Sequence, residues 1–150
     1  MAEIPVEEYL CTRIRRAEQA LMARHETVLR RYGLTQAQYT ALLTLHREGG
    51  LSGAQLARAS GVTQQTMATV LNGLQSKGLI QREVSPVHAK VQIASLTEEG
   101  LTLLEQAYDD VVVLDRALTD AFTPAEHTAL CDLLDRATTF LHHQSRPTAN

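Results

Sequence analysis

Apolar residues recur at intervals of three and four along most of the chain, which is typical of helices that bury one face. The N-terminal stripe comprises Val6, Leu10, Ile14, Ala17, Leu21, His25, Val28 and Tyr32. Gly33 follows it, and glycine commonly ends a helix. This spacing predicts a first helix from about Pro5 to Tyr32.

Five further helix starts carry capping signals. Thr35 and Ser52 are each followed three residues later by glutamine, which completes a capping box, and Leu34 with Tyr39 forms a hydrophobic staple. Thr123 precedes a proline and then a glutamate in the same pattern. We predict helices over residues 35–48, 53–60, 64–77, 97–121 and 124–143, with a frayed polar tail over 144–150.

The segment between the fourth and fifth of these six helices has a different pattern. Residues 79–84 and 91–96 carry β-branched side chains, and the second run alternates in part with a period of two. A polar loop over residues 85–90, which contains Pro86, separates them. We predict a β-hairpin with a long tip.

The helices predicted directly before this hairpin have the features of a helix-turn-helix. Ala57 is small where two helices would cross closely, and Gly61 permits the positive φ of a tight turn. Met67 and Val70 would face the core. The residues left facing outward are Gln64, Gln65, Ala68, Thr69, Asn72 and Ser76. Amides and hydroxyls suit hydrogen bonds to base edges in a major groove.

An ordinary helical hairpin with a polar face explains the outward residues equally well. The β-hairpin that follows decides between the two, because a hairpin after the second helix makes a winged helix-turn-helix. The fold class we expect is therefore mostly α with a small β wing, a winged helix-turn-helix flanked by long N- and C-terminal helices.

The net charge of −3 over 150 residues argues at first against a nucleic-acid binder. Its distribution changes that conclusion. Residues 51–95 hold four basic residues and one acidic residue, a charge of +3, whereas residues 96–150 hold three basic and ten acidic residues, a charge of −7. Residues 51–95 also contain no Phe, Tyr or Trp for base stacking, which favours duplex DNA as the target.

Other function classes find little support. No apolar run is long enough to span a membrane, and the N-terminus does not resemble a signal peptide, so we expect a cytoplasmic protein with no membrane partner. The chain contains no phosphate-binding glycine loop, zinc-protease motif or nucleophile signature, so we expect neither an enzyme nor a cofactor. A winged helix that binds protein instead of DNA stays an alternative.

The chain resembles the MarR family of bacterial transcriptional regulators over nearly its whole length. The resemblance rests on Leu-Thr-Gln-Ala-Gln-Tyr-Thr-Ala-Leu-Leu at 34–43, Gln-Leu-Ala at 55–57 with Gly-Val-Thr at 61–63, Leu-Gln-Ser-Lys-Gly-Leu-Ile-Gln-Arg at 74–82 and Leu-Thr-Glu-Glu-Gly at 96–100. It implies one domain over 1–150, with dimerisation helices at 1–33 and 101–150 and a winged head at 34–100. It also implies a homodimeric, ligand-responsive repressor that binds a pseudo-palindromic operator, with half-sites about 34 Å apart.

The resemblance and the outward face together give the expected DNA contacts. They are Thr63, Gln64, Gln65, Thr66, Thr69, Asn72, Lys77, Arg82, His88 and Lys90. The wing departs from the family pattern, because His88 stands where an Asp is common and Lys90 where an Arg is common. Lysine lacks the planar fork of arginine, which puts minor-groove reading by this wing in doubt.

The resemblance further implies an effector pocket between the dimerisation helices and the head, for a small molecule of which aromatic acids are one class. His25, Tyr39 and His46 are the candidate lining residues, although a hydrogen-bonded core histidine is the simpler interpretation of His25. Cys11 lies where a hydroperoxide-sensing branch of the family has its reactive cysteine. The tyrosines of that branch are replaced here by Arg15, His25 and Gln36, so we favour a small residue at the dimer interface over a redox sensor.

Metal binding has the weakest support. His127 and Cys131 lie one helical turn apart and are able to chelate together, but residues 105–115 contain no histidine, whereas the zinc-sensing relatives place histidines there. We therefore predict no metal site.

Overall fold

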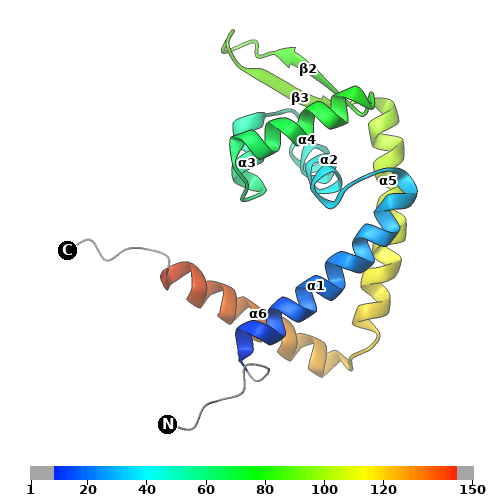
Figure 1. The fold of residues 1–150 in the computed structure, drawn as a ribbon, viewed down its shortest axis with the longest axis vertical. Helices are drawn as coiled ribbons and strands as arrows, with labels where there is room; N and C mark the ends of the chain where they lie inside the picture. The colour runs from blue at the N-terminus through cyan, green and yellow to red at the C-terminus, as the bar shows by residue number, and fades with distance from the viewer. Residues whose placement is uncertain (1–8, 145–150) are drawn as a thin grey trace, which may run out of the picture. The chain divides into compact units, whose positions relative to one another are not determined.

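The computed structural model of the protein describes residues 9–144, which form two compact units, one up to Val111 and one from Val112 (Figure 1). The first unit contains α1, α2, α3, α4, the sheet and most of α5. The elements are α1 (Leu10–Leu29), the 3-10 helix η2 (Arg30–Tyr32), α2 (Gln36–Glu48), β1 (Leu51–Ser52), α3 (Gly53–Ala59), α4 (Gln64–Ser76), β2 (Ile80–Val84), β3 (Gln92–Leu96), α5 (Glu98–Thr119) and α6 (Pro124–Gln144).

The helices begin where the capping signals predict. The hydroxyl of Thr35 accepts a hydrogen bond from the Gln38 backbone N–H at 3.2 Å, and the Gln38 side chain accepts one from the Thr35 N–H at 3.3 Å. Ser52 and Gln55 make the same reciprocal box at α3. These bonds satisfy N–H groups that a helix terminus leaves without intrahelical partners.

The start of α6 has a third capping box. The backbone N–H and the hydroxyl of Thr123 donate to the Glu126 carboxylate at 2.9 and 2.8 Å. These hydrogen bonds, the backbone bond first, lower the pKa of Glu126. The cap therefore contributes its stability above the ordinary glutamate pKa and loses it as the pH falls through the lowered value.

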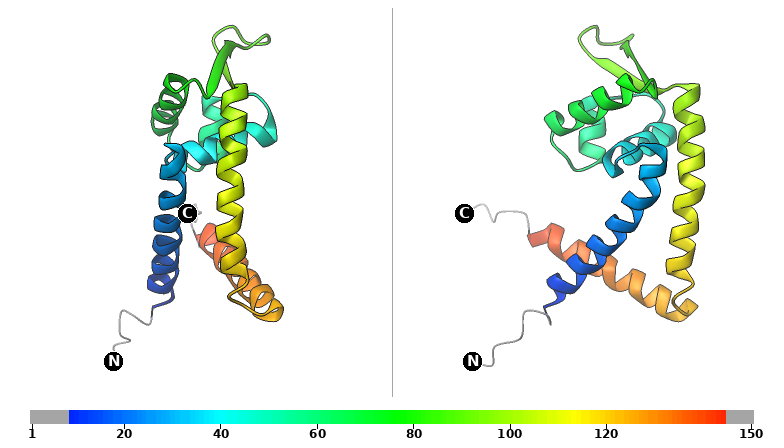
Figure 2. Two further views of the ribbon diagram at one scale, coloured as in Figure 1. Left: turned by 90° about the vertical axis from the view of Figure 1, so that its right-hand side faces the viewer. Right: turned by 45° about the vertical axis from the view of Figure 1, so that its right-hand side comes forward.

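Helices α3 and α4 form the predicted helix-turn-helix. Gly61 has φ +64°, and Ala57 is buried at the crossing, where its carbonyl accepts from Val62 N–H at 3.0 Å. The inner side of α4 lies in the core through Met67, Leu71 and Leu74. Figure 2 shows α3 and α4 side by side beneath the hairpin. The predicted inward and outward sides of α4 are confirmed.

The hairpin is confirmed, and a third strand extends its sheet. β2 and β3 pair antiparallel from Ile80 opposite Leu96 to Val84 opposite Gln92. β1 pairs with the other edge of β3, which gives the order β1-β3-β2. Sequence reasoning missed β1 because a strand of two residues shows no alternation.

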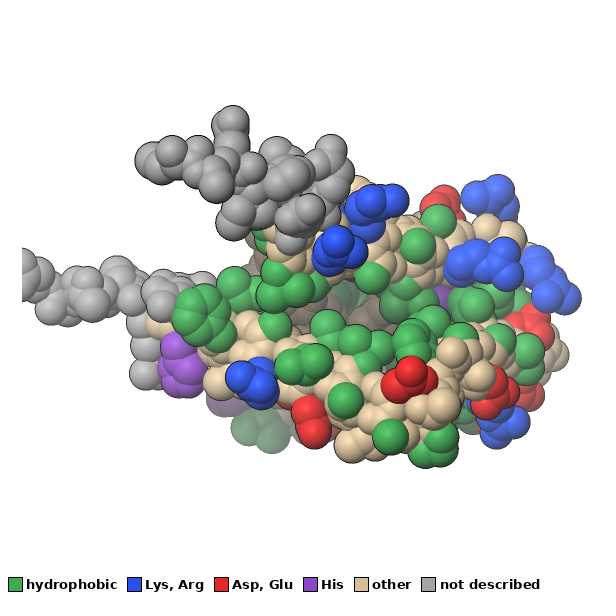
Figure 3. All heavy atoms as spheres, turned by 90° about the horizontal axis from the view of Figure 1, so that it is seen from below, with side chains coloured by type: hydrophobic (Ala, Val, Ile, Leu, Met, Phe, Trp, Pro, Cys, Tyr) green, Lys and Arg blue, Asp and Glu red, His purple; other side chains and the backbone are tan. Residues whose placement is uncertain are grey.

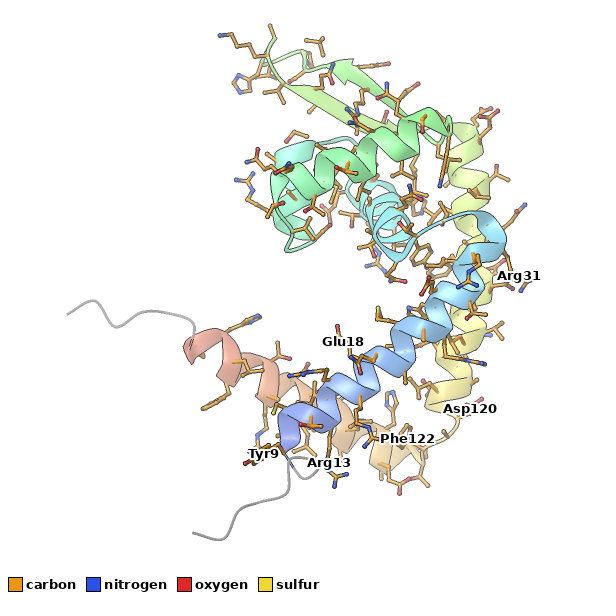
Figure 4. The ribbon with its side chains drawn as sticks, viewed as in Figure 1. Tyr9, Arg13, Glu18, Arg31, Asp120 and Phe122 are labelled. Carbon is orange, nitrogen blue, oxygen red and sulfur yellow. The ribbon has the colours of Figure 1, made fainter. Side chains whose placement is uncertain are left out.

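The end of the first helix differs from the prediction. Residues 30–32 form a 3-10 turn instead of continuing the α-helix, and Gly33 closes it at φ +64°. The turn is attached to α5, since Arg31 Nη1 and the Tyr32 hydroxyl both donate to the Asp110 carboxylate, at 2.9 and 2.7 Å. Figure 4 labels Arg31 at the end of α1 that lies beside α5. The hydrogen bond to Asp110 raises the pKa of Tyr32. The predicted start at Pro5 lies outside the described residues.

The second unit consists of the end of α5 and all of α6. None of the side chains described in α6 is buried. Large apolar side chains lie exposed on it, namely Leu130, Leu133, Leu134, Phe140 and Leu141. Figure 3 shows hydrophobic side chains, in green, open at the surface. The described helices include none that is long and apolar enough to cross a bilayer.

Gly100 allows a close approach of the start of α5 to the backbone of Leu79. A Cβ added there would collide with the Leu79 carbonyl oxygen and carbon, and these backbone atoms have little freedom to shift. The neighbouring Thr97 hydroxyl fixes this corner, because it donates to Gly78 O at 2.7 Å and accepts from Gly100 N–H at 3.0 Å.

We therefore expect Gly100→Ala to destabilise the head by about 1–3 kcal/mol, the usual cost of overpacking, or more. The measurement is urea unfolding followed by circular dichroism. Gly53→Ala is the control, since a Cβ at Gly53 meets only Leu71 Cδ1 at an ordinary 3.6 Å. Equal midpoints for the two variants would contradict the prediction.

Candidate nucleic-acid interface

The outward side of α4 is a continuous exposed polar surface. Gln64, Gln65, Thr69, Asn72 and Ser76 are all exposed, with Ala68 among them. Within residues 9–144 the side chains of Gln64 and Gln65 make no hydrogen bond, so both amides are available to a ligand. The surface offers donors and acceptors together at the first turns of the helix, where the positive end of the helix dipole lies.

The three threonines of this surface have different roles. Thr63 and Thr66 serve the cap of α4, because their hydroxyls lie 2.8 Å apart and Thr63 Oγ1 accepts from the Thr66 N–H at 3.1 Å. Thr69 donates its hydroxyl proton to the Gln65 carbonyl at 3.2 Å. Thr69 therefore presents oxygen lone pairs and a methyl group to the outside.

Arg82 of β2 contacts Asn72 of α4. Its Nη2 donates to Asn72 Oδ1 at 2.9 Å, which orients the amide with its NH₂ group away from Arg82. Asn72 is thus biased toward donating outward. The paired reading of adenine by an amide needs the oxygen as well, so this contact weakens that expectation for Asn72.

The tip of the wing is braced by a residue that sequence reasoning passed over. The Ser85 hydroxyl accepts from the backbone N–H groups of Val87 and His88, each at 3.3 Å, and Ser85 N–H donates to Val91 O at 2.7 Å. The signal was available, because serine two or three residues before a turn is typical of such braces. The side chains of His88 and Lys90 lie exposed.

Lys77 differs from the other expected contact residues. Its ammonium donates to the Gly33 carbonyl at 2.6 Å and to Gln38 Oε1 at 2.8 Å. Two of its three N–H groups are thus already engaged within the first unit, although the residue is exposed.

The positive charge of the head is not neutralised internally. Among the described residues, ion pairs join Arg30 with Glu26 and Arg31 with Asp110, and neither involves a cation of residues 51–95. Arg58, Lys77, Arg82 and Lys90 therefore keep their charge for an anionic partner, although Lys77 and Arg82 already hold neutral groups.

The three candidate effector residues have different surroundings. A cavity of about 360 Å³ lies between α2 and α5, lined by Leu43, His46, Arg47, Leu101, Leu104, Glu105 and Tyr108. His46 belongs to it, whereas Tyr39 is buried in the core, where burial and then Tyr108 raise its pKa. His25 is half-buried, and its Nδ1 has no partner among the described residues.

Sequence reasoning missed Arg47, Glu105 and Tyr108 in this cavity. The available signal was their spacing, since residues 43, 46 and 47 share one face of α2 and residues 101, 104, 105 and 108 share one face of α5.

Both cysteines are exposed free thiols. Cys11 is exposed near the start of α1, and its thiol has no hydrogen bond in the described chain. Cys131 is exposed, with its Sγ 3.9 and 4.0 Å from the ring nitrogens of His127. The described residues include no group of three or more metal-ligating side chains.

Comparisons with known proteins agree with this architecture. The family model described as the MarR family matches residues 32–90. An HTH-type transcriptional repressor of Mycobacterium tuberculosis is 32% identical over 104 residues, which cover 69% of this chain and 75% of that protein. An uncharacterised protein of the same organism is 35% identical over 111 residues, 74% of this chain and 77% of the relative.

Solved structures share the fold. BpsR of Bordetella bronchiseptica, whose DNA binding is regulated by 6-hydroxynicotinic acid, matches with a TM-score of 0.83 at 23% identity over 91% of this chain and 98% of its own. The transcriptional repressor CouR, bound to a 23-mer DNA duplex, matches with a TM-score of 0.82 at 24% identity over 92% and 99%. Together with the helix-turn-helix and its wing, these similarities show that the chain belongs to the MarR family of DNA-binding transcriptional regulators.

Proposed function

We propose that the protein is a sequence-specific repressor that binds a pseudo-palindromic operator in duplex DNA as a homodimer and is released by a small-molecule effector. One observation carries the DNA-binding part. The outward side of α4 is an exposed row of amides and hydroxyls, and the cations of the adjoining head have no acidic partner in the described chain.

The contacts divide by chemistry into those that read bases and those that hold phosphates. Gln64, Gln65 and Thr69 are proposed to reach base edges, with Asn72 donating to an acceptor. Thr63, Thr66, Arg82, His88 and Lys90 are proposed to contact the backbone. Residues 51–95 contain no Phe, Tyr or Trp on which bases could stack, which favours duplex over single-stranded targets.

The homodimer is supported by the apolar side of α6. Leu133 is 57% exposed and Leu134 is 46% exposed. A leucine side chain normally stabilises a protein by being buried away from water. A second copy of the chain is the occupant we propose for this side, because a two-fold dimer presents two heads to two half-sites.

The effector site is proposed in the cavity between α2 and α5. Arg47 supplies a positive charge, Tyr108 a ring and a hydroxyl, and Leu43, Leu101 and Leu104 an apolar wall. These groups suit a small aromatic acid, whose carboxylate would pair with the guanidinium. BpsR, which responds to 6-hydroxynicotinic acid, supplies the analogy.

The experiment that tests the proposal is enrichment of binding sites from a random pool of duplex DNA, followed by affinity measurements over a range of salt concentrations. We expect an inverted repeat to be enriched and the affinity to fall with salt. If no duplex is enriched, the repressor proposal fails, and a winged helix that binds protein instead of DNA becomes the favoured function.

Lys90 is expected to hold a phosphate and to carry no sequence information. Lys90→Ala should weaken binding to all duplexes and reduce the slope of log K against log salt by about 0.9 per lost contact. The control is Arg136→Ala, which removes the same charge from α6. An unchanged slope for Lys90→Ala would remove this residue from the contact surface.

Thr69 is expected to read sequence. Thr69→Ala should lower the discrimination at one base pair of each half-site by about 1 kcal/mol, because the oxygen and methyl group are lost together. Thr128→Ala is the control, since the Thr128 hydroxyl makes the same kind of bond, to Pro124 O at 3.0 Å. The enriched consensus is the measurement, and an identical consensus for Thr69→Ala would show that the proposed reading side is wrong.

Leu134 tests the dimer. Leu134→Asp would place a charge in the proposed apolar interface, so we expect the dimer to dissociate at protein concentrations where the wild type is dimeric. Sedimentation velocity measures this directly. Thr139→Asp adds the same charge at another exposed position of α6 and should leave the dimer intact.

A further inference from the structure

We propose that Lys77 is a positioning residue, which fixes the direction of α4 relative to the end of α1 and thereby sets the half-site spacing that the protein accepts. The inference rests on the proposed function, since spacing has meaning only for a dimer on DNA. It gives Lys77 a role different from the phosphate contact expected from its sequence position.

The contacts of Lys77 are directed at the turn between α1 and α2. Lys77 is the C-terminal capping residue of α4, and its ammonium reaches the Gly33 carbonyl at 2.6 Å and Gln38 Oε1 at 2.8 Å. Both acceptors lie about forty positions earlier in the chain. A charged donor on a neutral carbonyl forms one of the stronger hydrogen bonds in proteins.

Gln38 makes this connection rigid. It is the one polar side chain buried in the described core, at 9% exposure, and its Oε1 also accepts from the Thr35 N–H at 3.3 Å. Its Nε2 lies against α4, where a Cβ on Gly73 would come within 2.8 Å of it. The last turn of α4 is therefore held both by close packing and by the Lys77 hydrogen bonds.

The same turn is held from the other side by α5. Arg31 and Tyr32, directly before Gly33, grip Asp110. Residues 31–33 thus connect the end of α1 to α5 through Asp110 and to α4 through Lys77. A displacement of α1 that carries Gly33 with it has a direct route to the helix proposed to read the bases.

The test compares Lys77→Met with Arg58→Met. Both variants remove one positive charge from the head, but the Arg58 side chain is exposed and makes no hydrogen bond or ion pair in the described chain. The duplex is the one enriched by the wild type, together with versions that carry one base pair more or fewer between the half-sites. The measured quantities are the affinity ratio between the spacings and the salt slope.

We expect Lys77→Met to reduce the spacing discrimination at least threefold while its salt slope stays that of the wild type, and Arg58→Met to keep the discrimination. Lys77→Arg, which retains two or more donors, should restore it. Unchanged discrimination in Lys77→Met would overturn the inference, and so would a slope lower by about 0.9, the sign of a lost phosphate contact.

Hydrogen exchange on the free protein separates this failure from failure of the proposed function. Lys77→Met should speed amide exchange in residues 72–79 and 33–38, whereas Arg58→Met should not. Unchanged exchange overturns the inference whatever the DNA result. If the wild type enriches no duplex, the proposed function fails, and the spacing role of Lys77 fails with it even if hydrogen exchange confirms that Lys77 holds the turn. If the wild type does enrich a duplex, the proposed function stands and the Lys77 variants alone test the spacing role.

Discussion

Burial of one side of α4 is the constraint on which the head depends. Met67, Leu71 and Leu74 fill the core between α2 and α3, and they leave a single side of the helix for solvent. The polar side chains of α4 face outward because the buried residues on the opposite side fix the rotation of the helix. A register error of one residue would rotate the helix by about 100° and replace the amides with apolar groups.

Three glycines fit the corners of this arrangement for different reasons. Gly61 adopts φ +64° at the turn, a Cβ on Gly73 would come within 2.8 Å of Gln38 Nε2, and a Cβ on Gly100 would collide with the Leu79 backbone. Hydrogen bonds of Lys77 at one end of α4 and of Arg82 along its side then hold the orientation of the helix. The head is thus built from local steric limits, with a few long-range hydrogen bonds setting the orientation of its helices.

The sequence predicts the parts of this architecture that depend on local rules. Capping residues predicted the starts of α2, α3, α4 and α6, and the spacing of apolar residues separated the two sides of α4. Contacts between residues far apart in the sequence could not be predicted in this way. No spacing rule connects Lys77 with Gly33 or Arg82 with Asn72, because these pairs meet only once the helices have packed. The cavity residue Arg47 was missed for the same reason, since its relation to α5 is tertiary.

The wing is joined to the head by a regular ladder that ends before its tip. Pairing between β2 and β3 runs through Val84 and Gln92, Ser85 closes it, and the residues beyond fold on a serine brace without touching the core. The tip is therefore structurally independent of the core. A change in the length or charge of the tip would therefore alter how the wing meets a groove while leaving the packing of the head unchanged.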